Sequence, residues 1–410
     1  MTEPSNRRAL EDLKTVTRAD VYKAGSLAGH LTRNAHGGVD FAYTPQWRDS
    51  GAPAIATTLP VTPEPVVTAA GAVPSFFAGL LPEGRRLGAL VREVKTSADD
   101  ELLLLLAVGG DTVGDVQVVA DGDAPERTPA RLQIPSFDQV RFAEVLADMD
   151  VRSDRVALPG VQDKVSATMI SLPANAAGAQ VILKLNPREF KHLVENEHFF
   201  LGAAREAGIV TAEADLVHDA VGEPGLAVTR FDRASVAGEH VSLAVEDGCQ
   251  VLGRYPSAKY AVTTEAVLAR LASVCEAPVP AAAEFLAQAA FAYLTGNGDA
   301  HAKNFSVVQD MSGRWQPAPA YDLPSSQPYG DTTMALSVDG SSDGNITRSR
   351  YLALAEHLGV RARAAGVILD RVAASADVWL DGLDALPFDQ GSIRKLKRVI
   401  GHRQQLLRQG

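Results

Sequence analysis

The segment from Thr295 to Val307, TGNGDAHAKNFSV, constrains the possible fold more than any other part of the chain. It places Asp299, His301, Lys303 and Asn304 within six positions. The preceding residues, AAEFLAQAAFAYL, are apolar at helical spacing, and the following residues, FSVVQD, alternate and are β-branched as in a short strand. The polar side chains are therefore predicted to lie on a turn between two buried elements, where catalytic residues are commonly found.

The spacing of Asp299, Asn304 and Asp322 favours phosphoryl transfer from ATP. Asp322 lies in PAYDLPSS, beyond a second strand-like segment. Such a transfer needs a carboxylate that receives the acceptor proton and oxygen ligands for Mg²⁺. Protein kinases use the same spacing of an aspartate and an asparagine, followed by a second aspartate. One alternative is that Asn297 and Asp299 only cap turns, and His301 is compatible with a structural role or with a donor beside the site.

Lys184 is a candidate ligand of the ATP phosphates. It lies in VILKLN, and a charge within an otherwise apolar strand needs a nearby anion. The helical segment VENEHFF follows and offers Glu195 or Glu197 as the partner. The alternative is a lysine on an edge strand that faces water. The upstream loop, LPGVQDKVS, has a single glycine and matches neither a Walker A motif nor G-x-G-x-x-G.

The composition is that of an ordinary globular protein, with 46% hydrophobic and 22% charged residues among 410. No apolar run approaches the length of a membrane span, and the N-terminal residues lack the apolar core of a signal peptide, so a cytoplasmic protein without a membrane partner is expected. Cys249 and Cys275 fit a reducing compartment and do not form a metal signature. The net charge of −11 argues against a chain that binds DNA by itself.

Several motifs together resemble the HipA family of toxin-antitoxin serine/threonine kinases. In chain order they are GSLAGHL, FFAGLLPEG, VGGDTVGDVQ, LPGVQDKVSATM, ILKLN, NEHFFLGAAREAG, RFDR, EDGCQVLGRYPSAKY, GNGDAHAKNFS and YDLPSS. The similarity spans residues 18 to 370, and GNGDAHAKNFS is its most specific part. The resemblance implies an α+β, bilobal, protein-kinase-like fold with an added β-rich N-terminal subdomain. We expect this subdomain and a linker over 1–130, an N-lobe-like part over 131–235 and a mostly helical C-lobe over 236–410.

The resemblance also implies roles for individual residues, with ATP and Mg²⁺ as cofactors. Asp299 would be the catalytic base, and Asn304 and Asp322 would hold magnesium. The nucleotide-binding residues that it implies are Gly160, Val161, Gln162, Lys164, Lys184, Thr229, Phe231, Asp232, His301 and Lys303. Family members can be inactivated by autophosphorylation of a serine three residues before the loop glycine. Ala157 occupies that position here, so this self-silencing is not expected.

The implied partners are a small helix-turn-helix antitoxin of the HipB type and a protein substrate, which in the family is an aminoacyl-tRNA synthetase. DNA would be reached only indirectly, through the antitoxin. Two alternative functions share parts of the pattern. One is a small-molecule phosphotransferase of the aminoglycoside-kinase type, and the other is a degenerate kinase that serves as a co-repressor with the antitoxin.

The C-terminal residues, GSIRKLKRVIGHRQQLLRQG, predict a helix with one apolar and one basic face. Ile393, Leu396 and Ile400 would pack, while Lys397, Arg398 and Arg403 are among the basic residues. This face either keeps the helix solvated or approaches DNA phosphates once the antitoxin is bound to its operator.

Overall fold

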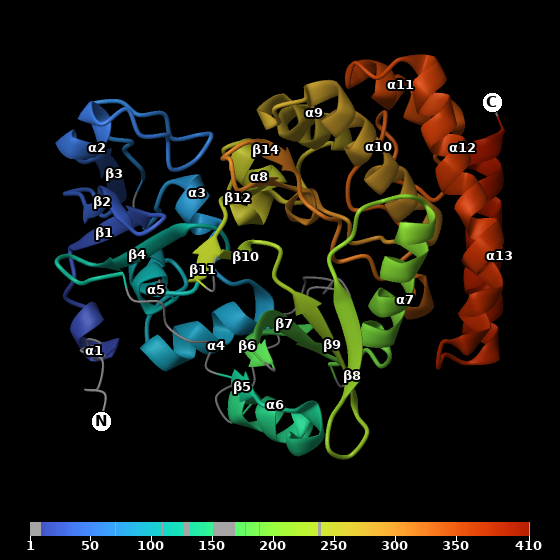
Figure 1. Cartoon of the computed structure of the whole chain (residues 1–410), viewed down its shortest axis with the longest axis horizontal. Coiled ribbons are helices and arrows are strands. Elements are labelled where there is room, and N and C mark those ends of the chain that lie inside the picture. The colour runs from blue at the N-terminus through green and yellow to red at the C-terminus, as the bar shows by residue number, and fades with distance from the viewer. Residues whose placement is uncertain are drawn as a thin grey trace. The chain divides into compact units, whose positions relative to one another are not determined.

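The computed structural model describes residues 10–69, 71–108, 110–125, 132–150, 169–176, 178–187, 189–236 and 239–409 (Figure 1). The chain divides into one unit of residues 1–129 with 147–156 and a second of residues 130–146 with 157–410. The subdomain boundaries expected at residues 130 and 235 stay predictions. The predicted phosphate loop, which includes Gly160, Val161, Gln162 and Lys164, lies outside the described residues, as does Ala157.

The first unit is built on an antiparallel sheet of four strands in the order β3-β2-β1-β4. Its strands are β1 (Arg18–Lys23), β2 (Ser26–Arg33), β3 (Val39–Tyr43) and β4 (Val116–Ala120). Ala24 and Gly25 have φ of 47° and 81° and form the two-residue turn between β1 and β2, as the twist of a hairpin requires. The helices are α1 (Leu10–Leu13), α2 (Pro45–Asp49), α3 (Ser75–Ala78), α4 (Gly84–Val94) and α5 (Glu101–Val108). This is the β-rich N-terminal subdomain that the resemblance implied.

The second unit contains a five-stranded sheet in the order β5-β6-β7-β9-β8. Its strands are β5 (Leu132–Ile134), β6 (Ile170–Ala176), β7 (Ala179–Leu185), β8 (Ala214–His218) and β9 (Pro224–Thr229). Among these described strands, only the β5–β6 pair is parallel. Helix α6 (Phe142–Asp150), preceded by η1 (Phe137–Gln139), follows β5 along the chain. Helix α7 (Leu193–Glu206) packs against β7, β8 and β9, and β7 lies between β6 and β9 in the sheet.

Two smaller sheets follow in the second unit. A hairpin pairs β10 (Arg233–Val236) with β11 (Glu239–Ser242). A three-stranded sheet has the order β12-β13-β14 and is formed by β12 (Val245–Asp247), β13 (Ser306–Gln309) and β14 (Trp315–Pro317). Helix α8 (Gly248–Val251) starts directly after β12, where Asp247 and Gln250 form a reciprocal capping box. This sheet therefore places Asp247 close to the residues that precede β13.

The rest of the second unit is mostly helical. Its α-helices are α9 (Thr264–Val274), α10 (Pro278–Thr295), α11 (Arg348–His357), α12 (Ala362–Trp379) and α13 (Gln390–Arg408). Short turns of 3₁₀-helix are η3 (Pro256–Ala258), η4 (Ala302–Asn304), η5 (Gln327–Tyr329) and η6 (Leu380–Ala385). Helix α10 contacts α9, α11, α12 and α13, and every residue from Phe285 to Thr295 is buried. The combination of a mostly antiparallel sheet with a helical lobe confirms the expected α+β, kinase-like fold class. Within the described part of the chain, no helix is both long enough and apolar enough to cross a membrane.

The C-terminal helix α13 corrects one expectation about its basic face. Ile393, Leu396 and Ile400 are buried, as the spacing predicted. Arg403 was expected among the exposed basic residues, but only 1% of it is exposed. Its guanidinium donates to the carbonyl oxygen of Tyr293 at 2.6 Å, in the last turn of α10. The last carbonyls of a helix lack partners within the helix, so a long cationic side chain from a neighbouring helix is drawn to them.

Candidate active site

The polar turn after α10 is held in place by hydrogen bonds that its own asparagine side chains accept. Helix α10 ends at Thr295 and is capped by Gly296, whose φ of 73° favours glycine. Asn297 accepts from the backbone N–H of Asp299 at 3.1 Å, and Asn304 accepts from the N–H of His301 at 3.0 Å. Gly298 is required by a close approach, since a Cβ there would lie 2.6 Å from the Ser326 hydroxyl oxygen. The predicted turn between a buried helix and a strand is therefore present, between α10 and β13.

Asp299 lies on this turn, and only 3% of it is exposed. The hydroxyl of Tyr260, which follows η3, donates to Oδ1 of Asp299 at 2.6 Å. A hydrogen bond of this length to a carboxylate is of the strong, charge-assisted kind. The aspartate is thus held at both its backbone and its side chain.

Lys184 binds two carboxylates at once. Its side chain on β7 is 8% exposed, and its ammonium lies 2.7 Å and 2.9 Å from the two carboxylate oxygens of Glu197 on α7. The same ammonium donates to Oδ1 of Asp322. The sequence left Glu195 and Glu197 open as partners; Glu195 instead contacts Asn186 and the ring of His192, each at 3.0 Å. The strand lysine is therefore buried and paired, and the alternative of a water-facing edge lysine is wrong.

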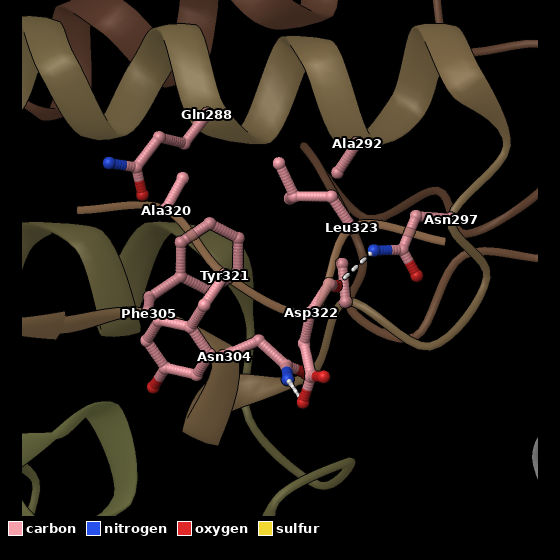
Figure 2. A pocket seen from close by; sticks show the side chains of 10 residues that line it. Gln288, Ala292, Asn297, Asn304, Phe305, Ala320, Tyr321, Asp322 and Leu323 are labelled. Carbon is pink, nitrogen blue, oxygen red and sulfur yellow. Dashed lines mark hydrogen bonds between the residues drawn. The ribbon is translucent and has the colours of Figure 1, made fainter. Parts of the chain in front are cut away.

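Asp322 is fixed by contacts from three side chains. Its φ is 56°, in the left-handed region that costs energy for a residue with a side chain. Asn297 donates to its carbonyl oxygen at 2.9 Å, and Asn304 donates to Oδ2 at 3.0 Å; Figure 2 shows both bonds. Lys184 binds the other carboxylate oxygen. These contacts hold the carboxylate of Asp322 beside the amide of Asn304, the two side chains predicted to ligate magnesium.

The charges of this group depend on one another. Burial raises the pKa of Glu197 above its ordinary value, although the Lys184 ammonium opposes this shift. Burial lowers the pKa of Lys184, but the carboxylates of Asp322 and Glu197 outweigh burial and raise the pKa above its ordinary value. Burial raises the pKa of Asp322, but the Lys184 ammonium outweighs it and lowers the pKa below its ordinary value. Lys184 and Asp322 are therefore both charged at neutral pH. Carboxylate and amide oxygens are ligands that Mg²⁺ accepts, so Asn304 and Asp322 have suitable donor types. Here the Asn304 amide nitrogen meets Asp322, and the Asn304 oxygen accepts from the N–H of His301.

The residues predicted to bind the nucleotide lie in several environments. Lys303 is paired with Asp247, its ammonium 2.7 Å from the carboxylate. Thr229 ends β9 and is exposed, while the ring of Phe231 packs on that of Tyr321 with 5.6 Å between centroids. Asp232 is buried between two arginines; the nearest contacts are 2.8 Å to Arg230 and 2.6 Å to Arg233. The nucleotide contacts of all four residues stay predictions.

Sequence reasoning missed two residues that contact the turn. Tyr260 reaches Asp299, and Asp247 reaches Lys303. Both lie in EDGCQVLGRYPSAKY, one of the segments that carried the family resemblance, but no spacing rule connects them with residues 299 to 304.

A small cavity lies beside Asp322. It is lined by residues of α10, the turn and the segment 320–323 (Figure 2).

Comparison with known proteins supports this interpretation of the fold. Residues 156–380 match the family model of the HipA-like C-terminal domain, and residues 19–119 match that of the HipA N-terminal domain. The chain is 30% identical to the serine/threonine-protein kinase toxin HipA of Shewanella oneidensis, over 76% of each protein. It is 31% identical to the Y4mE protein of Sinorhizobium fredii, over 79% of this chain and 81% of that protein.

A solved structure extends the comparison to the fold. It is a complex of Shewanella oneidensis HipA with HipB and operator DNA, and the matching chain has a TM-score of 0.77 and 25% identity. The match covers 94% of this chain and 96% of that one. Both units of the present chain are thus represented in the relatives.

Proposed function

Because the chain belongs to the HipA family and is a serine/threonine protein kinase, we propose that it transfers the γ-phosphoryl group of ATP, bound with Mg²⁺, to a protein hydroxyl. The observation that supports this proposal most directly is the group formed by Lys184, Glu197, Asp322 and Asn304. It combines a buried lysine held by two carboxyl groups with an amide side chain that contacts one of them. Phosphoryl transfer needs this combination around metal-bound phosphates.

Each residue of the group has a distinct role in this proposal. Asp322 and Asn304 hold the magnesium ion, and Lys184 binds the ATP phosphates while Glu197 keeps its ammonium in place. The ion supplies neutralisation of the phosphate charge. Asp299 receives the proton of the acceptor hydroxyl as the general base.

The remaining nucleotide contacts are proposed from the family resemblance. His301 and Lys303 serve the phosphate side, and Thr229, Phe231 and Asp232 line the adenine and ribose. The loop residues Gly160, Val161, Gln162 and Lys164 cover the phosphates.

The proposed setting is a toxin-antitoxin module with a HipB-type antitoxin. The matched Shewanella oneidensis structure contains HipB and operator DNA, which supports an antitoxin partner and an indirect route to DNA. The net charge of −11 agrees with a chain that needs the antitoxin to reach an operator. The proposed protein substrate is an aminoacyl-tRNA synthetase, as the resemblance implies.

Specific observations count against each alternative function. The HipA N-terminal domain over residues 19–119 has no place in a small-molecule phosphotransferase of the aminoglycoside-kinase type. A degenerate co-repressor does not require Asp299, Asn304, Asp322 and Lys184 together, and the described residues retain all four in contact or on one turn.

Calorimetry with ATP, with and without Mg²⁺, tests the nucleotide site. We expect binding that strengthens with Mg²⁺, and an absence of binding in both conditions would overturn the kinase mechanism.

Labelled ATP and a panel of purified aminoacyl-tRNA synthetases test the proposed protein substrate. If none of the synthetases is labelled but another protein of a cell lysate is, the proposed substrate would be wrong and the kinase activity would still hold.

A further inference from the structure

The segment that follows η3 contacts the turn of the proposed base at three points. The carbonyl oxygen of Lys259 accepts from the N–H of Ala302 at 3.2 Å. The ring of Tyr260 meets that of His301 nearly edge-on, with centroids 5.2 Å apart. The hydroxyl of Tyr260 donates to Oδ1 of Asp299 at 2.6 Å. One main-chain contact and two side-chain contacts therefore converge on residues 299 to 302.

The exposure of Tyr260 distinguishes it from a core aromatic residue. The tyrosine is 37% exposed, whereas Asp299 is 3% exposed. The ring therefore does not fill the interior, and its polar end reaches inward to a buried carboxylate. A buried charged group needs such hydrogen bonds, and a short O–H···O⁻ bond is among the strongest available.

A donor on one oxygen of a carboxylate restricts its rotation about the Cβ–Cγ bond. Asn297 fixes the backbone of Asp299, and the Tyr260 hydroxyl fixes its side chain. The direction of Oδ2 is then set before the acceptor hydroxyl arrives. General base catalysis depends on this alignment, because the base must lie within hydrogen-bonding reach of the proton that it removes.

We propose that Tyr260 is a positioning residue for phosphoryl transfer, which acts by orienting the carboxylate of Asp299. This inference rests on the proposed function, in which Asp299 is the base. It adds the segment after η3 to the acceptor side of the site.

The test is Tyr260→Phe, which removes one oxygen atom and keeps the ring that meets His301. We expect the turnover number to fall roughly 10- to 100-fold, the loss typical of one hydrogen bond to a charged group. The KM for ATP should change less than about twofold, since Tyr260 acts on the acceptor side. Unchanged turnover would overturn the proposal.

A double-mutant cycle separates positioning from a structural role. If Tyr260 acts through Asp299, the Asp299→Asn variant should lose no further activity when Tyr260→Phe is added. Multiplicative losses in the double variant would show an independent effect and overturn the proposal. Phosphate found on Tyr260 after incubation with ATP would also overturn it, because the phenol would then be an acceptor.

The matched control is Tyr329→Phe. The Tyr329 hydroxyl donates to the carbonyl oxygen of Lys191 at 3.0 Å, away from Asp299, so its loss should leave turnover unchanged.

The two variants also distinguish failure of this inference from failure of the proposed function. Full activity in Asp299→Asn would overturn the base itself, whereas loss in Asp299→Asn without loss in Tyr260→Phe would overturn only the role of the tyrosine.

Discussion

Each of the two units contains a buried lysine that is bound to carboxylate. In the first unit, Lys23 at the end of β1 lies 3.0 Å and 2.9 Å from the two oxygens of Asp115, and both side chains are less than 10% exposed. In the second unit, Lys184 on β7 binds both Glu197 and Asp322. The two lysine side chains are nearly equally buried, at 6% and 8% exposure.

The difference lies in the number of carboxyl groups that share the lysine. Lys23 and Asp115 form a one-to-one pair. Two carboxyl groups share Lys184; burial raises the pKa of Glu197, and Asp322 is held at a φ of 56°. A buried lysine on a strand therefore does not by itself indicate a functional site. The groups that bind it have to be known as well.

The largest effect on activity is expected from Asp299→Asn, outside both lysine groups. Loss of a general base costs roughly 10²- to 10⁴-fold in rate. The affinity for Mg-ATP should stay nearly unchanged, because the base acts on the acceptor and not on the nucleotide. Single-turnover transfer of labelled phosphate and calorimetry measure the two effects. Retention of full activity would mean that another residue is the base.

A second, smaller effect should separate the two lysine groups directly. Asp322→Ala should weaken Mg-ATP binding by at least about 10-fold, because a ligand of the ion is removed. Asp115→Ala should leave this affinity unchanged and instead lower the free energy of unfolding by about 3–5 kcal/mol, since it leaves Lys23 buried without its partner. Calorimetry and urea unfolding test the pair. Equal losses of affinity in both variants would remove the distinction between the groups.

Replacing whole pairs sharpens the comparison. The double variant Lys23→Met with Asp115→Leu should unfold at nearly the wild-type free energy or up to about 4 kcal/mol higher, because burial of an ion pair costs desolvation energy that apolar residues avoid. Its kinase activity should be retained. The corresponding double variant Lys184→Met with Glu197→Leu should bind Mg-ATP weakly whatever its stability. Loss of ATP affinity in the Lys23 variant would assign its pair to the nucleotide site.

The smallest effect is expected on the exposed side of α13. Lys397 contacts Asp384 at 2.9 Å in an exposed pair, and Arg398 is exposed beside it, whereas Arg403 is buried and is excluded from the test. Replacing Lys397 and Arg398 by Gln should preserve kinase activity. If they approach the operator through the antitoxin complex, the slope of log affinity against log salt should flatten by roughly 0.9 for each phosphate that is no longer neutralised. An unchanged slope would identify α13 as an ordinary solvated helix.

Much of the site was predictable because its signals are local. The apolar spacing of α10 and the alternation of β13 predicted the turn that carries Asp299 and Asn304. The choice between Glu195 and Glu197 could have been resolved as well. Glu197 lies four residues from Leu193 and Leu201, on the buried face of α7, while Glu195 lies on the other side of the helix.

The sequence by itself determined the fold class, the family and the residue types of the site, since periodicity and motif spacing are properties of neighbouring positions. Only the tertiary structure decided which side chains meet. The contact between Lys184 and Asp322 joins residues 138 apart, that between Tyr260 and Asp299 residues 39 apart, and that between Arg403 and Tyr293 residues 110 apart. The physical reason is that burial creates these contacts: a charged or polar group removed from water binds whichever partner the packing of helices and strands brings within reach.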